Sequence, residues 1–121
     1  MGCRIKILYV DDEPINLQLF EINFSDNYQV LIADNGFSGL DVLDKNPDIL
    51  IVISDMKMPN MNGLEFITKA KNNFPDKRFY LLTGFEITEE IKAALETGLI
   101  LKYFRKPYSK NEIERAIKEV I

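Results

Sequence analysis

Residues 49–63 read ILIVISDMKMPNMNG. The stretch begins with an apolar run that ends at Asp55, whose side chain is a carboxylate. A short apolar run bounded by turn-forming residues is typical of a buried strand, and Pro59 and Gly63 indicate a loop after it. The stretch therefore predicts that Asp55 lies at the end of a strand, where its side chain is held rigidly and is open to a ligand.

Strand-like and helical segments alternate along the rest of the chain. Besides the strand that ends at Asp55, the pattern predicts strands at residues 5–10, 29–33, 79–82 and 100–104. Helices are predicted to begin at or just after Pro14, Gly36, Gly63, Thr88 and Ser109. The sequence from Ser109 to Glu112 has the capping-box pattern, and Gly98 is suited to the position just after the end of a helix.

Apolar residues recur at helical spacing within each predicted helix. In chain order these are Ile15, Leu19 and Ile22; Phe37, Leu40 and Leu43; Leu64, Ile67 and Ala70; Ile91 and Leu95; and Ile113, Ile117 and Val120. The second and fourth of these sets are expected to face inward, and the third and fifth to form one apolar side of their helices.

A strand followed by a helix, five times over, predicts an α/β fold in which one parallel sheet has helices on both faces. Because crossovers between parallel strands are right-handed, few topologies remain, and we expect the doubly wound, flavodoxin-like strand order 2-1-3-4-5. At 121 residues the chain is expected to form one domain over residues 1–121, either standing alone or separated from a following domain. Ligands of such folds bind at the carboxyl ends of the strands, here strands 1 and 3.

The composition excludes several classes of function. The net charge of −4 offers no basic surface for nucleic acid. The single cysteine, Cys3, cannot form an internal disulfide, and the chain has no histidine to activate it as a nucleophile. No apolar run is long enough to span a bilayer and the start of the chain has no signal-peptide core, so we expect a cytoplasmic protein without a membrane partner.

A second acidic group, Asp11-Asp12-Glu13, follows the first predicted strand. Taken alone, acidic residues there are most often a solvated helix N-terminus, and a lone Asp55 after a strand is commonly a turn former or cap. Together, carboxylates that meet at one edge of a sheet repel each other unless a cation neutralises them. Because these ligands are all oxygens, the predicted cofactor is Mg²⁺.

Two further strand ends add to this edge. Lys106 follows the fifth strand, and its ammonium could reach back to the carboxylates and pair with a bound anion, although a solvated lysine is the ordinary alternative. Thr83 ends the fourth strand and offers a hydroxyl donor, although threonine is also common in strands. A carboxylate nucleophile with a divalent ion, a lysine and a hydroxyl donor indicates phosphoryl transfer to an aspartate.

The chain as a whole resembles the receiver domain of two-component response regulators, including the chemotaxis regulators. The residues that carry the resemblance are Asp11-Asp12, Asp55, Met58-Pro59, Met61-Asn62-Gly63, Thr83-Gly84, Tyr103 and Lys106-Pro107. The expected strand order is not independent of this resemblance, because a chemotaxis receiver is a standard example of that order.

The resemblance implies a role for each of these residues. Asp55 would accept a phosphoryl group from a histidine kinase or a phosphotransfer protein. Asp12, Asp55 and the backbone carbonyl of Lys57 would bind Mg²⁺, and Asp11 would act through water. Lys106 would pair with the phosphoryl oxygens. Thr83 would move to hydrogen-bond the phosphoryl group and Tyr103 would turn inward, although a half-buried strand aromatic is the ordinary alternative for Tyr103.

The same resemblance implies that the protein signals rather than acting as an enzyme on other substrates, while assisting its own phosphorylation and dephosphorylation. The surface expected to change is formed by the helix after Thr88, the strand at 100–104 and the helix after Ser109. Leu99, Ile100, Leu101, Lys102 and Phe104 are expected in or near it. That surface would contact an output domain or partner protein, with no direct contact to nucleic acid, and could support a homodimer that depends on phosphorylation.

Three other functions remain as alternatives, and a sequence feature bears on each of them. A haloacid-dehalogenase-type phosphatase needs a second aspartate two residues after the nucleophile, where this chain has Lys57. A flavodoxin needs a phosphate-binding loop after the first strand, where Asp11-Asp12-Glu13 would repel phosphate. A pseudo-receiver, which is a pure interaction module, usually lacks part of the set of site residues, and here none is missing.

The chain departs from the commonest receiver pattern in a few places. The segment from Pro47 to Asp55 is longer than usual, which concerns the loop before the strand rather than the site. Lys57 and Phe85, each two residues after a site residue, vary within the family. Neither can act as a general base, so they predict a long-lived phosphorylated state.

Overall fold

The sheet has five parallel strands in the order β2-β1-β3-β4-β5, which is the order expected from the sequence. The computed structural model describes residues 4–84 and 86–121, so the expectations for Cys3 and Phe85 lie outside the described residues. The strands are β1 (Lys6–Val10), β2 (Gln29–Ala33), β3 (Ile51–Asp55), β4 (Arg78–Thr83) and β5 (Lys102–Arg105). The helices are α1 (Pro14–Phe24), α2 (Gly36–Lys45), α3 (Gly63–Asn73), α4 (Glu89–Glu96) and α5 (Lys110–Lys118).

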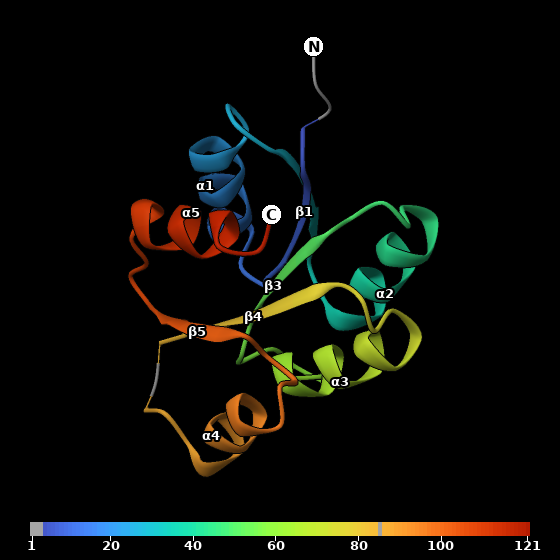
Figure 1. Cartoon of the computed structure of the whole chain (residues 1–121), viewed down its shortest axis with the longest axis vertical. Coiled ribbons are helices and arrows are strands. Elements are labelled where there is room, and N and C mark those ends of the chain that lie inside the picture. The colour runs from blue at the N-terminus through green and yellow to red at the C-terminus, as the bar shows by residue number, and fades with distance from the viewer. Residues whose placement is uncertain (1–3, 85) are drawn as a thin grey trace.

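Helices cover both faces of the sheet, as Figure 1 shows. On one face α1 and α5 pack against alternate strand residues such as Ile7, Ile53 and Leu82. On the other face α2, α3 and α4 pack against Leu8, Val52 and their neighbours. Because successive strand residues point to opposite faces, the central strands β1, β3 and β4 contribute to both cores, and this explains why their sequences are mostly apolar.

Helix ends follow the local sequence signals, with one difference. Gly98 directly follows the residue that caps α4 and has a φ of +79°, a backbone conformation that glycine adopts at little cost. Ser109 accepts a hydrogen bond from the backbone N–H of Glu112, which is one half of the predicted capping box. The complete reciprocal box lies instead at Asn62 and Glu65, at the start of α3.

Helix α1 is present where the spacing of its aliphatic residues predicted a helix, but those residues do not face the core. Ile15, Leu19 and Ile22 are 68%, 49% and 70% exposed, and the buried residues are Leu17, Phe20 and Phe24. The two phenylalanines also recur at helical spacing and bury more apolar surface than the aliphatic set, and Phe20 stacks on Tyr9 of β1 with ring centroids 4.2 Å apart. The aliphatic stripe Ile15–Leu19–Ile22 therefore lies on the surface of the molecule.

Phe37 was expected inside and is 62% exposed, whereas Leu43, expected inside as well, is fully buried. At the start of α2 the residues that face the core are glycines. Gly36 and Gly39 are buried there, and a Cβ on Gly39 would lie 2.8 Å from the ring of Phe66 in α3. The absence of side chains lets α2 and α3 approach closely, and the helix turns Phe37 outward.

Elsewhere the expectations are close to the structure. The residues predicted on the apolar side of α3 and α5, such as Ile67 and Ile113, are buried. Val120 follows the end of α5 and is only partly buried. Strand β5 begins at Lys102, two residues later than predicted. Of the residues expected near the changing surface, Ile100 and Phe104 are buried, whereas Leu101 and Lys102 are exposed.

None of the helices in the two described ranges is both long and apolar enough to cross a membrane.

Candidate functional site

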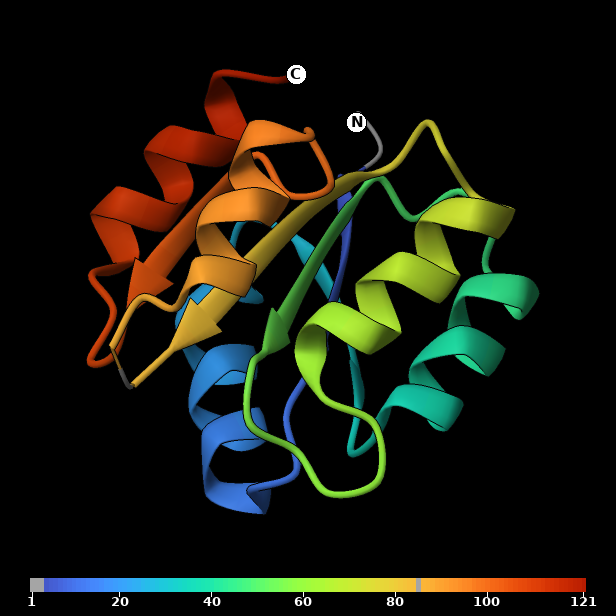
Figure 2. The same ribbon diagram turned by 90° about the horizontal axis from the view of Figure 1, so that it is seen from below.

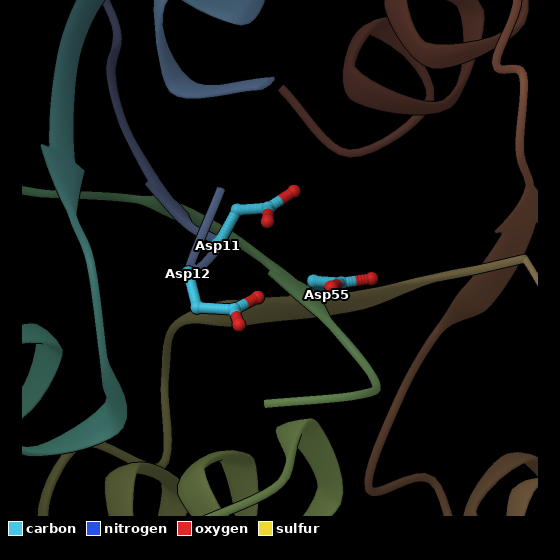
Figure 3. Close-up of side chains that lie close together, drawn as sticks. All are labelled: Asp11, Asp12 and Asp55. Carbon is cyan, nitrogen blue, oxygen red and sulfur yellow. The ribbon is translucent and has the colours of Figure 1, made fainter. Parts of the chain in front are cut away.

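Three carboxylates from two neighbouring strands meet at the carboxyl edge of the sheet. Asp11 and Asp12 follow β1 directly, and Asp55 is the last residue of β3, which pairs with β1 so that Val10 lies opposite Ser54. One carboxylate oxygen of each residue lies within 4.8 Å of those of the other two. Figure 3 shows the three side chains gathered at this edge, and Figure 2 views the same fold from below.

The backbone around Asp55 is tightly fixed. The amide of Met56 donates to the carbonyl of Leu82, and the amide of Gly63 donates to the carbonyl of Met56 at 2.8 Å. A Cβ on Gly63 would lie 2.3 Å from the backbone oxygen of Asp55, so only glycine allows the loop to return this closely. The glycine that the sequence identified as a turn residue thus helps to hold the end of β3 in place.

Lys106 extends from the end of β5 to these carboxylates. Its Nζ lies 2.9 Å from Oδ1 of Asp55 and 3.6 Å from Oδ2 of Asp11. Its backbone N–H donates to the carbonyl of Thr83 at 2.8 Å, which ties the loop after β5 to the end of β4. Burial lowers the pKa of Lys106, but the hydrogen bond to Asp55 and the nearby carboxylates outweigh burial and raise this pKa above its ordinary value. The lysine is therefore held as a cation.

Asp55 is only 5% exposed, and burial raises the pKa of its carboxyl group above the ordinary aspartate value. The hydrogen bond from Lys106 opposes this shift, whereas the charge of Asp11 adds to it. The protein shields this carboxylate from water on one side. Asp55 is therefore better suited to act as a nucleophile and a cation ligand than as a passive surface residue.

Asp11 is fully buried, and both of its oxygens accept hydrogen bonds. Oδ1 accepts from the backbone N–H of Glu13 at 3.0 Å, and Oδ2 accepts from the hydroxyl of Tyr9 at 2.5 Å. Tyr9 is not among the site residues predicted from the sequence. A usable signal was present, because residues two apart in an extended segment point to the same side.

The two residues expected to act as a switch lie on adjacent strands. Thr83 is buried at the end of β4, and Tyr103 is partly buried in β5. The register pairs Leu81 with Tyr103 and Thr83 with Arg105, so Thr83 and Tyr103 project toward the same face of the sheet, the face covered by α4. Tyr103 itself packs against the core on that face and does not join the carboxylates.

Lys57 is exposed in the loop after Asp55. It lines an open depression together with the site residues, formed by Asp12, Glu13, Asp55, Lys57, Met58, Pro59, Gly84 and Lys106. This depression places both the carboxylates and two lysines within reach of one bound ligand.

The donor set fits a magnesium ion. Three carboxylates within 4.8 Å of one another supply oxygen ligands only, and the chain contains no histidine that would favour zinc or another transition metal. The ammonium of Lys106 is ion-paired to two of the three carboxylates, and a divalent cation would neutralise further negative charge.

Comparisons with known proteins agree with this geometry. Residues 7–118 match the family model of the response regulator receiver domain. The chain is 34% identical over 118 residues to sporulation initiation phosphotransferase F of Bacillus subtilis, covering 96% of this chain and 93% of that protein. It is 29% identical to a chemotaxis protein CheY homolog of Campylobacter jejuni, covering 97% of this chain and 92% of the homolog.

A solved structure with the same fold is the crystal structure of a response regulator receiver domain protein from Clostridium thermocellum. The two structures align with a TM-score of 0.89 and 32% sequence identity, over 95% of this chain and 92% of the other. The family model covers most of the chain and the relatives are matched over nearly their full length, so the chain belongs to the response regulator receiver domain family.

Proposed function

We propose that residues 1–121 form a receiver domain that accepts a phosphoryl group on Asp55 from a histidine kinase or phosphotransfer protein. The single observation that carries this proposal is the 2.9 Å contact between Nζ of Lys106 and Oδ1 of Asp55, in a group of three carboxylates. A carboxylate that is both buried and paired with a lysine at the open edge of a sheet is suited to react with a phosphorus atom and to have the product charge stabilised.

In the proposed reaction a carboxylate oxygen of Asp55 attacks the phosphorus of a phosphohistidine. The new O–P bond forms as the P–N bond breaks, and the imidazole leaves with the electron pair and takes a proton. Lys106 stabilises the charge on the phosphoryl oxygens. Asp12, Asp55 and the backbone carbonyl of Lys57 would hold Mg²⁺, which supplies charge neutralisation at the phosphoryl group, and Asp11 would act through water.

Phosphorylation adds about −1.5 to −2 charges at this point, with strong hydrogen-bond acceptors. Thr83 and Tyr103 project toward the same face, which supports a switch in which Thr83 bonds to the phosphoryl group and Tyr103 turns inward. The two conformers pre-exist, and the phosphoryl group stabilises one of them. The surface of α4, β5 and α5 would then signal to an output domain or partner protein in the cytoplasm.

The exposed stripe of Ile15, Leu19 and Ile22 supports one location for the phosphodonor. Leu19 lines a groove of about 390 Å³ whose other wall is Lys106, Pro107 and Tyr108. The apolar stripe thus continues into the groove that ends at the site lysine. A donor protein that covers the stripe would bury exposed apolar area while its phosphohistidine approaches Asp55.

The test is phosphorylation by acetyl phosphate with Mg²⁺, followed by the intact mass of the protein. One added phosphoryl group is expected in the wild type and none in Asp55→Asn. A phosphoryl group that persists in Asp55→Asn would show that Asp55 is not the acceptor. A wild type that takes up no phosphoryl group and does not respond to beryllofluoride with Mg²⁺ would favour the pseudo-receiver, and turnover of a phosphate ester would favour a phosphatase.

A further inference from the structure

The hydroxyl of Tyr9 and the ammonium of Lys106 approach the same oxygen, Oδ2 of Asp11. The hydroxyl donates to it at 2.5 Å, whereas Nζ of Lys106 is 3.6 Å away. A separation of 3.6 Å is an ion pair but is too long for a good N–H···O hydrogen bond. Lys106 makes its short contact, 2.9 Å, with Asp55 instead. The lysine thus bonds closely to only one of the two carboxylates within its reach.

We propose that Tyr9 is a positioning residue that occupies Oδ2 of Asp11 and thereby keeps Lys106 on Asp55. The proposal rests on the function proposed above, since it concerns where the lysine stands when Asp55 receives a phosphoryl group. The family resemblance rests on other residues, and none of the roles it implies involves Tyr9.

The tyrosine is held rigidly enough for this role. It is buried, and its ring stacks on Phe20 at 4.2 Å with an angle of 10° between the ring planes. A hydroxyl that donates to a carboxylate at 2.5 Å forms a strong, charge-assisted hydrogen bond. Since Glu13 holds the other oxygen of Asp11, the carboxylate has little freedom to rotate away.

Removing the hydroxyl would leave a buried carboxylate oxygen without its close donor. A buried oxygen without a donor costs free energy, so a nearby donor is expected to move toward it. Lys106, already at 3.6 Å, is the cation that can move to it. In Tyr9→Phe we therefore expect Lys106 to move toward Asp11 and to loosen its contact with Asp55, while the ring stacking on Phe20 is kept.

The first experiment is a comparison of crystal structures of the wild type and Tyr9→Phe without metal. The expected result is Nζ of Lys106 within hydrogen-bond distance of Oδ2 of Asp11 and farther from Oδ1 of Asp55 than in the wild type. A lysine that remains on Asp55 in Tyr9→Phe overturns the proposal. This readout does not require phosphorylation, so it stands even if Asp55 proves not to be the acceptor.

The second experiment measures the rate of phosphorylation by acetyl phosphate at saturating Mg²⁺. We expect Tyr9→Phe to be slower by about ten- to a hundredfold, because a misplacement of about 1 Å in a catalytic geometry can cost about a hundredfold in rate. Affinity for Mg²⁺, measured by titration, should be no weaker, because no carboxylate is lost. If Tyr9→Phe only disturbed the structure of the site, both the affinity for Mg²⁺ and the phosphorylation rate would fall. Equal losses in affinity and rate therefore contradict the proposal.

Two further variants isolate the effect. In a Lys106→Met background, Tyr9→Phe should cause no additional loss of rate, because the tyrosine acts through the lysine. An equal loss in both backgrounds overturns the proposal. Tyr80→Phe is the matched control: Tyr80 is also buried and packs on Phe104, but its hydroxyl is 3.5 Å from the carbonyl of Ala116, away from the site. A loss in Tyr80→Phe as large as in Tyr9→Phe would likewise contradict it.

Discussion

Lys106 and Asp55 meet at 2.9 Å although β4 lies between their strands in the sheet. The backbone N–H of Lys106 is bonded to the carbonyl of Thr83, which fixes the loop after β5 beside the end of β4. From there the lysine side chain extends past the carboxyl end of β4 to Asp55. Because Lys106 also pairs with Asp11, residues at the ends of β1, β3 and β5 form one site.

Magnesium should stabilise the fold through the carboxylates. A ligand that binds only the native state adds stability by mass action, so millimolar Mg²⁺ should raise the melting temperature of the wild type. Asp12→Ala should lose most of this shift, because one of the three clustered carboxylates is removed. Thermal denaturation with and without Mg²⁺ measures the effect. An equal shift in both proteins would place the ion elsewhere.

Replacing Asp55 should stabilise the protein at neutral pH in the absence of metal. The pKa of Asp55 is raised in the folded state, chiefly by burial, so its charged form costs stability above the pKa of the unfolded chain. Asp55→Asn should melt higher than the wild type at pH 7. The difference should shrink as the pH falls toward about 4, where the unfolded carboxyl is protonated.

Asp48→Asn is a control of opposite sign for this pH series. The hydrogen bond from Lys6 lowers the pKa of Asp48, so the contribution of its charged form is present at neutral pH and is lost as the pH falls through the lowered folded pKa. Asp48 is exposed, so its effect should be small. An Asp55→Asn gain that does not depend on pH would rule out the carboxylate charge as its cause.

The exposed stripe on α1 should matter for transfer from a donor protein and not for transfer from a small phosphodonor. Ile15→Ser with Ile22→Ser should change the free energy of unfolding by less than about 0.5 kcal/mol per site, because both side chains are exposed. Phosphotransfer from a phosphorylated histidine kinase that acts on the wild type should fall about tenfold, the equivalent of about 1.4 kcal/mol. The rate with acetyl phosphate should not change.

Phe37→Ser is the matched control for this pair, since Phe37 is equally exposed but lies on α2. If it reduces kinase transfer as much as the α1 variants do, the α1 stripe is not the docking surface.

Lys77 should contribute to stability at the opposite edge of the sheet. Its ammonium is buried and donates to the carbonyl of Pro47 at 2.9 Å and to that of Ile49 at 2.5 Å. Lys77→Met keeps the aliphatic stem but leaves both carbonyls without this donor, so a loss of about 1–3 kcal/mol is expected in denaturant unfolding. Lys69→Met, at an exposed position of α3, is the control, with less than about 0.5 kcal/mol expected.

The phosphorylated state should be long-lived because the side chains at 57 and 85 cannot activate water. Lys57 lines the depression with Asp55 and, as a cation, has no acceptor for the proton of an attacking water. Lys57→Asn and Phe85→Glu should both lose the phosphoryl group faster than the wild type, as followed by intact mass over time. If both variants keep it as long or longer, this explanation is wrong.

Much of the fold could be predicted from the sequence, because the signals involved are local. The alternation of apolar strands with capped helices predicted the five strands and five helices found in residues 4–84 and 86–121. The right-handedness of crossovers left few possible topologies. The convergence of Asp11, Asp12, Asp55 and Lys106 followed from their positions at the ends of parallel strands, which share one edge.

The inward faces of α1 and α2 could not be settled from local spacing. Two apolar stripes compete on α1, and the choice depended on the ring of Tyr9 across the interface, which favours Phe20. On α2, buried glycines replaced Phe37 because α3 packs against them, a fact that the sequence of α2 does not contain.

The sequence by itself determined which elements form and which strand ends carry charge, since both depend on residues close together in the chain. Only the tertiary structure decided which hydrogen-bond partners the charged groups have. The hydroxyl of Tyr9 donates the short hydrogen bond to Oδ2 of Asp11, and the ammonium of Lys77 donates to the backbone carbonyls of Pro47 and Ile49. The physical reason is that hydrogen-bond choice depends on distances of a few tenths of an ångström between segments far apart in sequence.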